Sequence, residues 1–216
     1  MIEGNLIVLE GVDGAGTTTH AKILESHFQT RGLPVRTTRE PSDGPVGMLL
    51  RQILTGRIVV PGMRGGRPPS WTTMALLFAA DRMDHGEATI SPNLMDGVTV
   101  LSDRYDYSSV AYQSTTGGGT EDVVAWVREL NRHARRPHLT LVLDVPPEVA
   151  AERRDNRGSG AEMYDDRELQ ETLGGFYANI EQYFPDDNIA HVDANRPVEA
   201  VAEEIRHHVA VLRNEA

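Results

Sequence analysis

Five short apolar runs, each followed by a segment with helical periodicity, constrain the fold of this chain most strongly. The apolar runs occupy residues 5–11, 33–41, 98–105, 138–145 and 188–194. Strands that alternate with helices in this way form a parallel sheet with helices on both faces. We therefore predict a three-layer α/β fold in which residues 1–216 form a single domain around one five-stranded parallel sheet.

The segments between the runs carry apolar residues three and four positions apart, which is typical of helices. They predict helices at residues 17–32, 46–56, 71–97 with a break near Pro92, 120–136, 146–158, 165–184 and 197–214. In open α/β sheets, ligands bind beyond the carboxyl ends of the strands. Gly11, Glu40, Asp103 and Asp144 all fall at such ends, so we expect the site there.

Composition excludes several classes of function. A net charge of −11 argues against a nucleic-acid polymer as partner, because its phosphates would be repelled. The chain has no cysteine, which rules out disulfides, thiolate metal sites and cysteine nucleophiles. It shows no signal-peptide pattern and no apolar run long enough to span a bilayer, so we expect a cytoplasmic protein without a membrane partner.

Residues 11–18, GVDGAGTT, lie between the first apolar run and the first predicted helix. A phosphate-binding loop has the pattern G-x-x-x-x-G-K-[ST], in which backbone N–H groups and a helix N-terminus surround an anion. Gly11, Gly16 and Thr18 fit this pattern. We expect ATP phosphates to contact Gly11, Val12, Gly14, Ala15, Gly16, Thr17, Thr18 and Thr19, with the Thr18 hydroxyl also on Mg²⁺.

The lysine of that pattern is replaced by Thr17. Lys22 is the only lysine in the chain, and it lies roughly 140° around the predicted helix from position 17. We therefore expect Lys22 to face solvent rather than substitute for the missing charge. Taken alone, residues 11–18 could also be an ordinary glycine-rich turn.

Further motifs give the loop a context. The segments VLEGVDGAG, TREP, LLFAADR, SDRYDYSSVAYQ and RRDNRG occur in an order and spacing that resemble thymidylate kinases, from Leu6 to the last helix. This resemblance implies a P-loop nucleoside monophosphate kinase fold with a mobile lid. It also implies transfer of the γ-phosphoryl group from ATP to dTMP with Mg²⁺, and a homodimer formed through helices such as WTTMALLFAADRM.

The resemblance also assigns roles to residues at the strand ends. Asp103 would hold Mg²⁺ together with Thr18, and Arg104 would bind the acceptor's phosphate. Asp13 would lie near the acceptor's sugar and phosphate. A carboxylate beside phosphates is repelled, so we expect Asp13 to need a metal ion or a sugar hydroxyl as its partner.

The acceptor nucleotide would be read by residues from three segments. The resemblance implies that Phe78 stacks on thymine and that Arg82 bonds its carbonyl, while Glu40 and Pro41 form a turn beside the acceptor. Ser109, Tyr112 and Gln113 would read the base edge and crowd the 2′ position of the sugar.

Two further residues are assigned to the donor side by the same resemblance. Tyr164 and Asp165 would lie near the donor nucleotide.

A lid of about residues 153–165 carries Arg153, Arg154 and Arg157. Phosphoryl transfer requires positive charge and exclusion of water, which a closing arginine-rich lid supplies. Residues 11–18 contain no arginine, so the resemblance is to members with arginines in the lid. We expect these arginines to compensate for the missing lysine.

Two alternatives stay open from the sequence. The chain could phosphorylate another, modified pyrimidine nucleotide, or it could be a low-activity or non-catalytic nucleotide-binding homologue, because Thr17 replaces the lysine. A GTP-binding switch is excluded, since its N-K-x-D motif needs a lysine and the only one lies in HAKIL.

Overall fold

A computed structural model describes residues 3–62, 66–156, 163–164 and 166–215. It contains a five-stranded sheet in the order β2-β3-β1-β4-β5, and every neighbouring pair is parallel. The strands are β1 (Leu6–Glu10), β2 (Val35–Arg39), β3 (Thr99–Asp103), β4 (Leu139–Asp144) and β5 (Ile189–Asp193). The five predicted strands and their parallel arrangement are confirmed.

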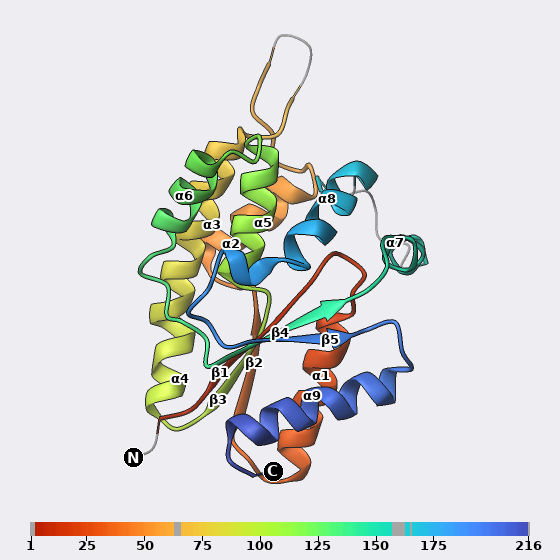
Figure 1. The fold of residues 1–216 in the computed structure, drawn as a ribbon. Helices are drawn as coiled ribbons and strands as arrows, with labels where there is room; N and C mark the ends of the chain where they lie inside the picture. The colour runs from red at the N-terminus through yellow and green to blue at the C-terminus, as the bar shows by residue number, and fades with distance from the viewer. Residues whose placement is uncertain (1–2, 63–65, 157–162, 165, 216) are drawn as a thin grey trace.

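Helices cover both faces of this sheet. They are α1 (Thr17–Thr30), α2 (Pro45–Leu54), α3 (Trp71–His85), α4 (Ser91–Met95), α5 (Asp106–Thr116), α6 (Glu121–Leu130), α7 (Pro147–Asp155), α8 (Arg167–Tyr177) and α9 (Val198–Leu212), with a π-helical turn at Gly86–Ile90 and a 3₁₀ turn at Ile180–Gln182. Figure 1 shows α1 and α9 together on one face, and α3, α4 and α5 on the other. None of the helices in the described part of the chain is long and apolar enough to cross a membrane.

The central strands are apolar because both of their faces are covered. All five residues of β1 are completely buried, and β4 is buried up to its last residue. Strands covered on both faces read as continuous apolar runs rather than as alternating patterns. The edge strand β2 is partly exposed and carries polar residues. Because the central strands are filled with apolar residues, polar side chains are found mainly where these strands end.

Helix α5 was not predicted. Its sequence, DYSSVAYQSTT, lacks an apolar stripe at helical spacing, yet eight of its eleven residues are buried. Several of these buried residues are polar, among them Ser109, Gln113 and Ser114. A helix whose buried faces carry polar groups does not show the periodicity on which such a prediction relies.

Three of the predicted helices differ from the observed ones in where they end or break. The segment predicted at 120–136 ends as a helix at Leu130, and the one predicted at 165–184 ends at Tyr177 and is followed by the 3₁₀ turn. In the segment 71–97, the α-helix gives way to the π-helical turn at Gly86, whereas a break was predicted near Pro92. Pro92 lies in the first turn of α4, where its missing N–H costs little.

The predicted lid is described only in part. Arg153 and Arg154 lie in the last turn of α7, and residues 163–164 precede α8. Arg157 and Asp165 lie outside the described residues, so the prediction for these two positions is not tested.

Candidate active site

The loop at residues 11–18, called here the phosphate loop, joins β1 to α1. Gly11, Gly14 and Gly16 have φ values of 148°, 97° and 103°, a region that glycine enters freely. Gly14 is also required for packing, since a Cβ there would lie 2.4 Å from the carbonyl oxygen of Ala150 in α7. Helix α7 therefore rests directly on the phosphate loop.

The two threonines at the start of α1 differ in their surroundings. Thr17 is only 7% exposed, whereas the exposed Thr18 donates its hydroxyl to Oδ2 of Asp103. The other oxygen of Asp103 is buried and has no partner among the residues that the structure describes. An unsatisfied carboxylate oxygen beside a hydroxyl suits a hard cation such as Mg²⁺. Lys22 is exposed, which confirms that it faces solvent.

Arg104 joins the end of β3 to the phosphate loop. Its Nη1 donates to the Gly11 carbonyl at 2.9 Å and to the Ser108 hydroxyl at 3.1 Å, and its Nη2 lies 2.5 Å from Oδ1 of Asp13. The Arg104 backbone has a φ of 73°, which is uncommon for a residue other than glycine. This conformation turns the guanidinium toward the loop.

Asp13 is held by the protein itself. Besides Arg104, its carboxylate accepts from the Tyr112 hydroxyl at 2.9 Å and from Nε2 of Gln170 at 3.0 Å. These partners hold Asp13 without a metal ion or a sugar hydroxyl, and the predicted contact with either group stays a prediction. These contacts could not be predicted from the sequence, because the three partners lie 91, 99 and 157 residues away along the chain.

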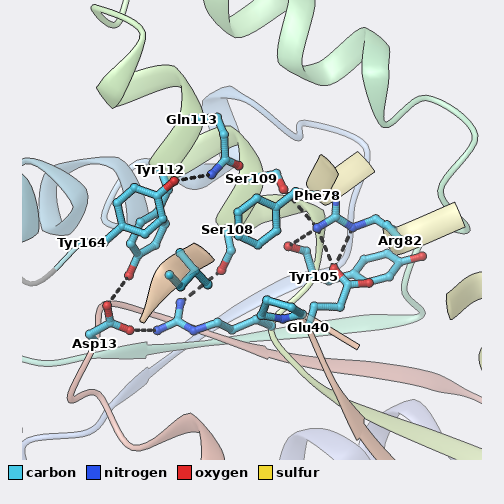
Figure 2. A pocket seen from close by; sticks show the side chains of 13 residues that line it. Asp13, Glu40, Phe78, Arg82, Tyr105, Ser108, Ser109, Tyr112, Gln113 and Tyr164 are labelled. Carbon is cyan, nitrogen blue, oxygen red and sulfur yellow. Dashed lines mark hydrogen bonds and ion pairs between the residues drawn. The ribbon is translucent and has the colours of Figure 1, made fainter. Parts of the chain in front are cut away.

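A cavity of about 150 Å³ lies beside this ion pair (Figure 2). It is lined by Asp13, Glu40, Pro41, Leu54, Phe78, Arg82, Arg104, Tyr105, Ser108, Ser109, Tyr112, Gln113 and Tyr164. The seven residues expected to bind the acceptor all lie in this lining. Tyr164, expected near the donor, lies here instead. Leu54, Tyr105 and Ser108 were not singled out from the sequence.

Arg82 is part of the floor of the cavity and is only 1% exposed. Its Nε donates to Glu40 at 2.8 Å, its Nη1 to Asn131, and its Nη2 to the Tyr105 carbonyl and the Ser109 hydroxyl, both at 3.1 Å. All three nitrogens thus serve protein acceptors. Arg82 holds Glu40 and the start of α5 in place as well as facing the cavity.

One residue of the cavity lining, Gln113, carries an unsatisfied acceptor atom. The residue is 1% exposed, and its Oε1 is buried with no partner within the described ranges. Its Nε2 donates to the Tyr164 hydroxyl at 3.5 Å, which is a weak bond. Because an unsatisfied buried oxygen is costly, it favours a ligand that carries an N–H group. Phe78, half-buried in the same lining, provides an aromatic ring.

Glu10, the last residue of β1, lies completely buried beneath the site. It accepts hydrogen bonds from the Tyr105 N–H at 2.7 Å, the Ser108 hydroxyl at 2.7 Å and the Tyr177 hydroxyl at 2.9 Å. Burial raises the pKa of Glu10 to about 7, although Arg104 and these donors oppose the shift. In the sequence, the only feature that distinguishes Glu10 is its position as a carboxylate at the end of an apolar strand.

The arginines of α7 reach two different places. Nη1 of Arg154 donates to the carbonyl of Asp13 at 2.7 Å, and Nη2 of Arg153 donates to the carbonyl of Ala194 at 3.0 Å. Arg153 also lines a second cavity of about 250 Å³ on the other side of the phosphate loop, together with Gly16, His20 and Arg196. The loop is thus flanked by two cavities.

Comparisons with known proteins identify the family of this chain. A family model described as thymidylate kinase matches residues 9–205. The chain belongs to the thymidylate kinase family. A probable thymidylate kinase of Pyrococcus abyssi is 37% identical over 99% of this chain and 98% of its own length. A probable thymidylate kinase of Thermococcus kodakarensis is 40% identical over 92% of this chain and 94% of its own length. A thymidylate kinase of Symbiobacterium thermophilum is 36% identical over 93% of this chain and 90% of its own length. The resemblance inferred from five motifs is confirmed.

In this thymidylate kinase family member, the buried Glu10 makes stability depend on pH. Its pKa is about 7 in the folded state and 4.5 ordinarily, so the folded state keeps a proton that the unfolded chain releases. The resulting stabilisation is complete below about pH 4.5 and is lost as pH rises through about 7. At about 1.4 kcal/mol per pKa unit, the loss reaches roughly 3 kcal/mol.

Urea unfolding of the wild type and of Glu10→Gln between pH 5 and pH 8 measures this effect. We expect the wild type to lose roughly 2–3 kcal/mol relative to the variant, which cannot titrate at this position. Equal differences at every pH would contradict the assignment.

Proposed function

We propose that this chain transfers the γ-phosphoryl group of ATP to dTMP and so forms dTDP. The observation that carries the proposal is the position of the Asp13–Arg104 pair. Both residues line the acceptor cavity, while Asp13 belongs to the phosphate loop and Arg104 donates to the carbonyl of Gly11 in that loop. A nucleotide in the cavity and phosphates on the loop would therefore meet at this pair. Direct transfer between two bound nucleotides requires this adjacency.

The cavity has the chemistry of a pyrimidine site. The Phe78 ring offers a face for stacking, and the unsatisfied Oε1 of Gln113 accepts from the N3–H of thymine. Arg104 then lies at the phosphate end of the acceptor, where its guanidinium forms paired hydrogen bonds with phosphate oxygens. The base is thereby held at one end of the cavity and its phosphate at the other.

The donor's phosphates bind the phosphate loop. Its backbone N–H groups and the N-terminus of the fourteen-residue helix α1 favour negative charge. The reaction needs no covalent intermediate, because positioning and charge stabilisation supply most of the catalysis in phosphoryl transfer. ATP's nucleoside would then occupy the cavity beside Arg153.

Thr18 and Asp103 would hold Mg²⁺ in this site. Their oxygen atoms lie together, and one Asp103 oxygen has no protein partner within the described part of the chain. Mg²⁺ commonly takes only one or two protein oxygens and completes its shell with water and phosphate oxygens. When bound, it would neutralise charge on the donor's phosphates.

Association into a homodimer is part of the proposal. The outward sides of α2 and α3 expose large apolar side chains, with Met48, Leu49 and Leu76 at 51%, 37% and 52%. These two helices pack side by side, so the exposed residues lie on neighbouring elements. Exposed apolar patches of this kind mark interaction surfaces.

The acceptor is tested with a panel of dTMP, dUMP, dCMP, UMP and dGMP in a coupled assay for ADP. We expect dTMP to give the highest kcat/KM. Gln113→Leu should lower the value for dTMP roughly 10-fold or more, since a hydrogen bond contributes on the order of 1–3 kcal/mol when its loss leaves a buried partner unpaired.

Ser114→Ala is the matched control for Gln113→Leu. Ser114 neighbours Gln113 on α5 and also has a buried unpartnered oxygen among the described residues, but it does not line the cavity. Another nucleotide of the panel used better than dTMP would assign another acceptor. Binding of both nucleotides without turnover would show a non-catalytic protein.

Arg154 is the cation proposed to offset the missing lysine. Among the described residues, it and Arg104 donate to carbonyls of the phosphate loop, and Arg104 is already paired with Asp13. We expect Arg154→Met to lower kcat about 10²-fold, in line with the loss of one charge-stabilising donor. Thr17→Lys in the Arg154→Met background should restore a large part of that loss.

Arg167→Met serves as the control for this series, because Arg167 on α8 is exposed and pairs with Glu171. Steady-state kinetics of five proteins decide the question: the wild type, Arg154→Met, Thr17→Lys, the double variant and Arg167→Met. An unchanged kcat in Arg154→Met, or a Thr17→Lys change that raises kcat equally with and without Arg154, would reject the compensation.

A further inference from the structure

Gln170 of α8 is a buried amide to which the sequence alone assigned no role. The residue is 4% exposed, and it makes three hydrogen bonds to two separate parts of the site. The oxygen and the nitrogen of its side chain are both engaged. Such a fully satisfied buried amide is rigid, because breaking any of its bonds leaves a polar group unpaired.

On one side, Gln170 holds the phosphate loop. The Asp13 backbone N–H donates to its Oε1 at 3.2 Å, and its Nε2 donates to Oδ2 of Asp13 at 3.0 Å. The main chain and the carboxylate of Asp13 are thus fixed by the same group. Any movement of the loop at Asp13 is transmitted to Gln170.

On the other side, Gln170 holds the wall of the acceptor cavity. Its Nε2 donates to the carbonyl of Tyr164 at 2.9 Å. The ring of Tyr164 lines the cavity and packs edge-on against Tyr112, with 5.2 Å between ring centres. The backbone N–H of the preceding residue, Met163, donates to the carbonyl of Leu54, which lines the same cavity.

We propose that Gln170 is a positioning residue that couples occupancy of the phosphate loop to the position of Tyr164 in the wall of the acceptor cavity. The Nε2 atom bonds Asp13 and Tyr164 together, so a loop fixed by a nucleotide also fixes the wall. The coupling is reciprocal, because each ligand must raise the affinity for the other by the same factor. This inference rests on the proposed function in taking ATP and dTMP as the two ligands.

A purely structural role makes a different prediction. If Gln170 only fills space between α8 and the loop, its replacement would lower stability or weaken both nucleotides without changing how one affects the other. The ratio of dTMP dissociation constants without and with donor is therefore the deciding quantity. It is measured by titration calorimetry with Mg²⁺ and a non-hydrolysable ATP analogue.

Two variants remove the coupling in different ways. Gln170→Met keeps the length of the side chain and loses every hydrogen bond. Gln170→Glu keeps the shape and the acceptor for the Asp13 N–H but has no donor for Tyr164 or Asp13 when ionised. Gln182→Met is the control, since Gln182 is exposed in the 3₁₀ turn after α8.

We expect the analogue to tighten dTMP binding about 10-fold in the wild type and in Gln182→Met. In Gln170→Met and Gln170→Glu the ratio should fall to within twofold of one. Affinity of the Met variant for the analogue alone should change less than about threefold. If Gln170→Met does not fold, as judged by circular dichroism, Gln170→Glu decides.

A wild-type ratio near one, or variants that keep the wild-type ratio, would overturn the proposal. The binding ratio is measured without turnover, so it stays decisive if the chain makes no dTDP. A chain that shows coupled binding but no dTDP would reject the proposed function and leave the coupling through Gln170 standing.

Discussion

The ion pair between Arg104 and Asp13 connects the parts on which this structure depends. Arg104 follows β3 and Asp13 follows β1, and these strands are neighbours in the sheet. The pair lies where the phosphate loop meets the cavity lined by Phe78 and Gln113, and Tyr112 and Gln170 bond the same carboxylate. Arg104 adopts a positive φ, a conformation of a kind that costs on the order of 1–3 kcal/mol and persists when its surroundings over-determine it. Three hydrogen bonds from its guanidinium do so here.

The missing lysine changes where positive charge lies in the site. Thr17 is buried and carries only a hydroxyl, while Arg154 reaches the carbonyl of Asp13 from α7. That approach is possible because Gly14 leaves room for Ala150 against the loop. A charge normally built into the first turn of α1 is therefore proposed to come from a different helix. Its position depends on how α7 packs, which adds a tertiary constraint to the chemistry of the loop.

Local patterns predicted most of the framework but not all of the site. The strands followed from apolar runs. Residues that line the cavity followed from short motifs whose members share one helix or one strand end, such as Phe78 and Arg82 on α3. Helix α5 was missed because its buried faces are polar. Glu10, Gln170 and the position of Tyr164 were missed or misplaced because their roles come from contacts between segments far apart along the chain.

The sequence by itself determined the parallel α/β architecture, the phosphate loop with its lysine replaced, and the membership of the family. These features follow from hydrophobic periodicity and from motifs whose residues lie close together along the chain. Only the tertiary structure decided that Asp13 pairs with Arg104, that Tyr164 lines the same cavity as this pair, and that Gln170 bonds both Asp13 and Tyr164. The physical reason is that burial and hydrogen-bond partners depend on which distant segments pack together, and no local pattern specifies that packing.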